Sequence, residues 1–150
     1  MAAGVRERLA EDLKSAMRAK DALRLSTIRM ARSEILNKDK EGREDIPEEE
    51  ILKLLQSMVK RREEASEQFA KGGRPELAEK EREEIGILRN YLPAQMDKEE
   101  IAEEARAAIA ELEASSMREM GKVMGFLTKK LAGRAPGALI SQVVKELLGG

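Results

Sequence analysis

A run of apolar residues at helical spacing, bounded by Pro47 and Gly72–Gly73, constrains the fold of this chain more than any other feature. Its members are Ile51, Leu54, Leu55, Met58, Val59, Ala65 and Phe69. Proline suits the start of a helix, the carboxylates at residues 48–50 suit its positive end, and paired glycines end helices. The pattern therefore predicts a long amphipathic helix, which needs other elements to cover its apolar face.

Composition extends this prediction to the whole chain of 150 residues. Charged residues make up 38% of it and aromatic residues only 2%. Strands favour aromatic and β-branched residues, whereas Ala, Leu, Glu, Lys and Arg favour helices. The residue usage therefore predicts an all-α fold.

Three further helices are expected to complete a first domain at residues 1–92. One spans residues 5–20, the next begins after Asp21 as its N-cap, and the last begins at Pro75. The polar segment 37–45 contains a glycine and is expected to be a loop. The second and third helices are long enough to pack as antiparallel partners, which would give an elongated helical domain.

A second, smaller domain is expected to begin at the Leu92–Pro93 pair, because proline disfavours helix in the residue before it. The segments 97–100 and 116–119 each have the spacing of a capping box, and each is expected to open a helix. Gly133 closes the second of these helices, and Pro136 begins another. The expected domain is thus a small bundle of three helices.

Residues 115–150, which lie within this second domain, contain the main concentration of positive charge. From residue 115 onwards there are six Lys or Arg and two Glu, although the whole chain has a net charge of −1. Clustered cations attract polyanions, so this domain is the first place to look for an RNA-binding surface.

Five cations of the second domain are candidate phosphate contacts. Helical spacing places Arg118, Lys122 and Lys129 on one face of a helix. Lys130 and Arg134 follow near the C-terminal end of that face. Cations there also suit the negative end of a helix dipole, so a merely solvated face is the alternative interpretation.

Two glycines lie among these cations, at Gly121 and Gly125. Glycines spaced four apart permit close approach either by a neighbouring helix or by a sugar-phosphate chain, and both interpretations are open. Phe126 is the only aromatic residue of the segment, whereas RNA modules that read bases use several stacking aromatics. Recognition of phosphates and shape is therefore the expected mode if this face binds RNA.

The first domain has two basic clusters on its second and third helices. Their members are Arg24, Arg29, Arg32, Lys60, Arg61 and Arg62. Glutamates neighbour most of these side chains, so a surface of ion pairs is the preferred interpretation. The acidic run at residues 79–84 is likewise interpreted as a solvated face rather than a metal site.

The chain contains no histidine and no cysteine, which excludes Ser-His-Asp and Cys-His nucleophiles, disulfides and the usual zinc sites. Gly121–Lys122 is not a phosphate loop, because Ser116 and Val123 replace the glycine and the hydroxyl residue that such a loop needs. We therefore predict no catalytic residue, no metal site and no cofactor. No apolar run could span a bilayer and no export signal is evident, so no membrane contact and a cytoplasmic location are expected.

Several motifs together resemble the YqeY family over nearly the whole chain. They are Asn90–Ile101, Met120–Met124, Gly133–Arg134, Ser141–Lys145, Arg61–Phe69 and Arg74–Glu81. That family is similar to the tail of GatB, a subunit of the tRNA-dependent amidotransferase. The resemblance implies an α-helical first domain and a three-helix tail that contacts the outer part of tRNA. The positions that it assigns to RNA contact are Gly121, Lys122, Lys129, Gly133 and Arg134.

The chain departs from the family pattern in two places. Pro136 stands where an acidic residue is common, and Ala94 stands where a lysine is common after Leu-Pro. The second departure removes one candidate phosphate contact. Nothing in the chain resembles the catalytic cradle of GatB.

Three functions are compatible with these observations. The leading hypothesis is a non-catalytic tRNA-binding or tRNA-related accessory protein, with tRNA and proteins of tRNA metabolism as partners. The resemblance implies an alternative, an amidotransferase-like carbon–nitrogen ligase with glutamine as amido donor, or a subunit of one. A third hypothesis is a helical adaptor that binds proteins through the apolar residues of 51–69 or through the final helix.

Overall fold

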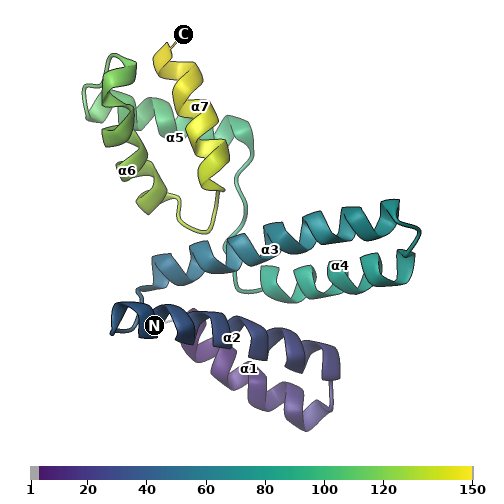
Figure 1. The fold of residues 1–150 in the computed structure, drawn as a ribbon. Helices are drawn as coiled ribbons and strands as arrows, with labels where there is room; N and C mark the ends of the chain where they lie inside the picture. Colours follow the sequence, from purple (N-terminus) through teal and green to yellow (C-terminus); the bar gives the residue numbers. More distant parts are fainter. Residues whose placement is uncertain (1–3, 150) are drawn as a thin grey trace. The chain divides into compact units, whose positions relative to one another are not determined.

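The computed structural model describes residues 4–149, and the predicted all-α class is confirmed because this range contains no strand. Seven α-helices and one short 3-10 helix follow one another along these residues (Figure 1). Their contacts divide the chain into two compact units, Met1–Leu92 and Pro93–Gly150.

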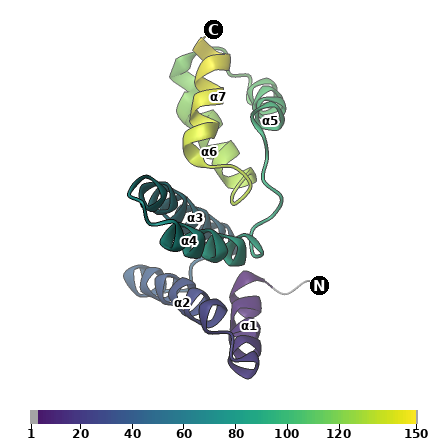
Figure 2. The same ribbon diagram turned by 90° about the vertical axis from the view of Figure 1, so that its right-hand side faces the viewer.

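The first unit consists of two helical hairpins. Helix α1 (Val5–Ala19) packs against α2 (Ala22–Gly42), and α3 (Glu48–Lys71) packs against α4 (Pro75–Arg89). Each pair lies side by side in both views (Figure 1 and Figure 2). The buried side chains that join the hairpins include Val5, Leu9, Ile28, Ile35, Ile51, Leu55, Met58, Ile85 and Leu88.

The predicted pairing of the second and third helices is wrong, because the main partner of α3 is α4. The turn at Gly72–Gly73 reverses the chain at once, and Gly73 has a left-handed φ of 75° that favours glycine. The contacts that hold the hairpin include an ion pair of Arg62 with Glu84 and a hydrogen bond from the Ser66 hydroxyl to the carbonyl of Ala78. Local chain reversal therefore decides the pairing.

The predicted loop at residues 37–45 is also largely wrong, since α2 continues to Gly42. Asp39 is buried in this last part of α2 and accepts two hydrogen bonds from the Arg6 guanidinium, at 2.8 and 3.1 Å. It also accepts a hydrogen bond from the backbone N–H of Ile46 at 2.8 Å. These bonds come from α1 and from beyond α2, and they stabilise a segment whose local sequence looks like a loop.

Two of the predicted helix caps are confirmed and one is wrong. The Asp21 carboxylate accepts from the Arg24 N–H, and Asp97 forms a complete capping box at the start of α5 (Lys98–Glu111). The predicted box at 116–119 does not form, because Ser116 makes no side-chain cap. Its residues instead form the 3-10 helix η1 (Met117–Glu119), and the Glu119 carboxylate accepts from the N–H of Ser115.

The second unit packs α5, η1, α6 (Met120–Lys130) and α7 (Gly137–Gly149) around a core of its own. All three α-helices contact one another. The core consists mainly of Met96, Ile101, Ala105, Ala108, Val123, Leu127, Leu131, Ile140, Val143 and Val144. None of the helices at residues 4–149 has the length and apolar character needed to cross a membrane.

Candidate nucleic-acid interface

Helix α6 has one face in the core and the opposite face at the surface. Val123 and Leu127, and Leu131 directly after the helix, are fully buried at a spacing of four residues. With 3.6 residues per turn, the side of the helix away from these residues carries the predicted cations and glycines. We call this exposed surface the glycine face. It is formed by Gly121, Lys122, Gly125 and Lys129 on α6, and we include the exposed Arg118 of the preceding 3-10 helix η1.

The two glycines leave the backbone of α6 bare. A Cβ atom added at Gly121 or Gly125 would meet no heavy atom within 4 Å outside the local helix backbone. The interpretation in which these glycines let neighbouring helices cross tightly is therefore wrong. Glycine costs a helix interior about 1 kcal/mol relative to alanine, and no packing gain offsets that cost here.

Within the part of the chain that the structure describes, the cations of the glycine face have no carboxylate partners. Lys122 donates from Nζ to the backbone carbonyl of Leu112 at 3.2 Å, which leaves its charge uncompensated. Arg118 and Lys129 are exposed and form no ion pair or side-chain hydrogen bond with residues in the described range. The glycine face thus combines three positive charges with accessible backbone.

Lys130 differs from these three cations. Its Nζ lies 2.9 Å from a carboxylate oxygen of Glu104 on α5 and 5.8 Å from the centre of the Phe126 ring. The ion pair joins the side chain to α5, whereas the Phe126 ring lies on α6 itself. The structure therefore pairs Lys130 within the unit.

Gly133 and Arg134 lie in the turn between α6 and α7. Gly133 is buried and has a left-handed φ of 78°, so it shapes the turn and offers no open surface. Its carbonyl accepts from the Gln95 side chain at 2.7 Å, and the carbonyl of Arg134 accepts from the N–H of Met96 at 2.9 Å. These bonds position the exposed Arg134. Gln95 was not identified from the sequence, where only its place after Leu-Pro distinguishes it.

The basic clusters of the first unit are partly ion-paired. Arg24 lies 3.4 Å from Asp12, Arg61 lies 2.8 Å from Glu34, and the partly buried Arg62 contacts Glu84 and Glu81. The remaining members, Arg29, Arg32 and Lys60, form no such pair with residues 4–149. Within the same residues no group of three or more acidic side chains is arranged to hold a metal ion.

The chain is similar to fungal proteins that share one name, "Altered inheritance of mitochondria protein 41, mitochondrial". It is 32% identical over 146 residues to that of Pyrenophora tritici-repentis, covering 95% of the chain and 80% of the relative. It is 34% identical over 139 residues to that of Clavispora lusitaniae, covering 88% and 81%. For Lachancea thermotolerans the identity is 43% over 86 residues, covering 56% of the chain and 46% of the relative.

These names correct the expectation of a cytoplasmic location, which is wrong. The relatives in all three fungi are named as mitochondrial proteins. The expectation rested on composition and on the lack of an apolar signal core. Neither observation distinguishes the cytoplasm from the mitochondrion, because mitochondrial targeting segments are amphipathic and lack such a core.

The similarity extends across both units of the structure. The family model for YqeY, described as Yqey-like protein, matches residues 6–148. The match includes α1 to α4 of the first unit and the glycine face of the second. The chain therefore belongs to the YqeY family.

Proposed function

We propose that this protein is a non-catalytic tRNA-binding accessory protein and that residues 93–150 form its RNA-binding domain. Residues 1–92 would then be a separate helical domain. The observation that carries the proposal is the glycine face, where Arg118, Lys122 and Lys129 have no carboxylate partner among residues 4–149 and the helix backbone is bare at the two glycines. The names of the fungal relatives support a mitochondrial setting for this activity.

The proposed contact is electrostatic and depends on shape. A sugar-phosphate chain that lies along α6 can approach closely at Gly121 and Gly125, because no Cβ stands in its way. The flanking cations then donate charge-assisted hydrogen bonds to phosphate oxygens. Since this face presents no aromatic side chain, the proposal includes no stacking on bases.

A gel-shift series with total tRNA at increasing salt tests the proposal. Neutralising about three phosphates releases their counterions, so log affinity should fall against log salt with a slope of about −2 to −3. A slope near zero, or no binding at the lowest salt, would contradict the proposal.

A further inference from the structure

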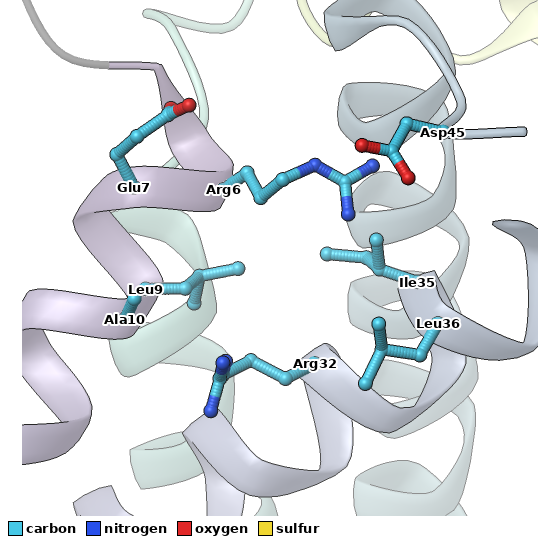
Figure 3. Close-up of a pocket in the computed structure, with 8 residues that line it drawn as sticks. All are labelled: Arg6, Glu7, Leu9, Ala10, Arg32, Ile35, Leu36 and Asp45. Atoms are coloured by element: carbon cyan, nitrogen blue, oxygen red, sulfur yellow. The ribbon is translucent and has the colours of Figure 1, made fainter.

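Helices α1 and α2 enclose a pocket of about 410 Å³ that the proposed RNA contact does not use (Figure 3). Its walls are apolar where Leu9 and Ile35, both buried, face one another, and Ala10 and Leu36 extend the walls outward. Leu36 is 49% exposed, so the pocket is open to solvent on this side. A volume of this size is within the range of small-molecule sites.

One end of the pocket has a surplus of negative charge. The Arg6 guanidinium is held by Asp39 and also donates to the carbonyl of Ile46 at 3.3 Å. The hydrogen bonds to Asp39 raise the pKa of Arg6, and the nearby charges of Asp45 and Glu7 raise it further. Three carboxylates therefore surround one guanidinium. Among residues 4–149, Asp45 and Glu7 have no ion-pair partner.

The other end of the pocket has a single positive charge. Arg32 lines the pocket, is half-buried, and forms no ion pair or hydrogen bond with the described part of the chain. Figure 3 shows its guanidinium at the end opposite to Arg6, Glu7 and Asp45, with Leu9 and Ile35 between the two ends. The guanidinium is a planar fork that suits a carboxylate, and it is free to bind one.

We propose that this pocket binds a small dipolar molecule in which an aliphatic chain separates a carboxylate from an ammonium group. The carboxylate pairs with Arg32, the ammonium pairs with Asp45, and the aliphatic chain lies on Leu9 and Ile35. Free ω-amino carboxylates have this chemistry, and so does a lysine at the C-terminus of a peptide. The proposal is independent of RNA binding, because the pocket belongs to the first unit.

Nuclear magnetic resonance titrations of the full chain with three probes of equal apolar length test the dipolar match. The probes are ε-aminocaproate, which carries both charges, caproate, which carries only the carboxylate, and pentylamine, which carries only the ammonium. We expect ε-aminocaproate to bind at least about tenfold more tightly than either of the others, with shifts at Leu9 and Ile35. Equal binding of the three, or no shift at these residues, would overturn the proposal.

Single substitutions with matched controls test which end of the pocket binds the carboxylate of the probe and which end binds its ammonium group. Arg32→Gln should lower the affinity for ε-aminocaproate about tenfold, whereas Arg29→Gln on the same helix should leave it unchanged. Asp45→Asn should lower the affinity for ε-aminocaproate and leave the affinity for caproate unchanged. Glu44→Gln, at the neighbouring residue, should change neither affinity. Retained affinity in both the Arg32 and Asp45 variants would overturn the assignment.

A fourth probe distinguishes a peptide C-terminus from a free ω-amino acid as the natural ligand. Nα-acetyl-lysine presents the two charges of a C-terminal lysine together with a peptide-like amide. If it binds more tightly than ε-aminocaproate, the natural ligand is a peptide end, and the opposite order indicates a free ω-amino acid. If neither probe binds, the proposal is wrong.

Discussion

Among residues 4–149, both units contain paired and unpaired cations, but the ion pairs with a buried carboxylate lie in the first unit. In the first unit, Arg6 and Arg62 are bound to carboxylates and hold helices together. In the second, Arg118 and Lys129 are exposed and have no acidic partner within the described residues. A count of charges along the sequence therefore does not locate a binding surface, because a paired cation is already neutralised. The pairing state of each cation separates structural charge from charge that is available to a ligand.

The largest effect is expected where a cation is used structurally. Glu84→Ala should lower the free energy of unfolding by about 3 kcal/mol, because it leaves the partly buried Arg62 without its main partner. Glu79→Ala on the same helix is the control, since Glu79 pairs with Arg82 in an exposed position. Its cost should be below about 1 kcal/mol in a urea unfolding series. Equal costs for the two variants would remove the distinction between buried and exposed pairs.

A smaller effect of opposite sign is expected on the glycine face. Gly121→Ala and Gly125→Ala should each raise the free energy of unfolding by about 1 kcal/mol, because Cβ atoms there meet open space. Both should weaken tRNA binding, since the new methyl groups stand where the sugar-phosphate chain approaches. Gly86→Ala on α4, also in open space, should stabilise the chain without changing tRNA affinity. Unchanged affinity in all three variants would show that the bare backbone is not used.

The smallest effect is expected at Lys130. Because Glu104 already neutralises this side chain at an exposed position, Lys130→Gln should change tRNA affinity by about twofold or less. Lys129→Gln, one residue earlier, is the comparison and should lower affinity more. A filter-binding assay at low salt distinguishes the two. If Lys130→Gln lowers tRNA affinity as much as Lys129→Gln does, the ion pair between Lys130 and Glu104 must open on binding.

Much of the fold could be predicted from local signals. Helix starts are marked by the caps at Asp21 and Asp97, whose hydrogen bonds involve only neighbouring residues. They are also marked by the prolines at 47 and 75, which suit the start of a helix. One error, the loop predicted at residues 37–45, came from a distant contact. The segment 37–42 is helical because Arg6 bonds to Asp39 across a separation of 33 residues, which no local pattern reveals.

The candidate site, too, could be predicted only in part from local sequence patterns. Helical spacing predicts that Lys122 and Lys129 share a face of α6, because periodicity fixes the face of a helix, whereas Arg118 lies in η1. It could not show that Lys130 pairs with Glu104 on another helix, or that the glycines face open space. The pocket beside Arg32 gave no signal in the sequence, since its charges come from α1, α2 and the segment after α2.

The central claim is that the unpaired cations of the second unit, rather than those of the first, bind tRNA. Lys122→Glu with Lys129→Glu tests it against Arg29→Glu with Lys60→Glu. The second pair changes the net charge equally, at exposed positions of the first unit that have no ion-pair partner among residues 4–149. We predict that the first pair lowers tRNA affinity about a hundredfold at low salt, with an unchanged circular dichroism spectrum, and that the second pair has little effect. Equal losses in both double variants, or retained affinity in the first, would contradict the account.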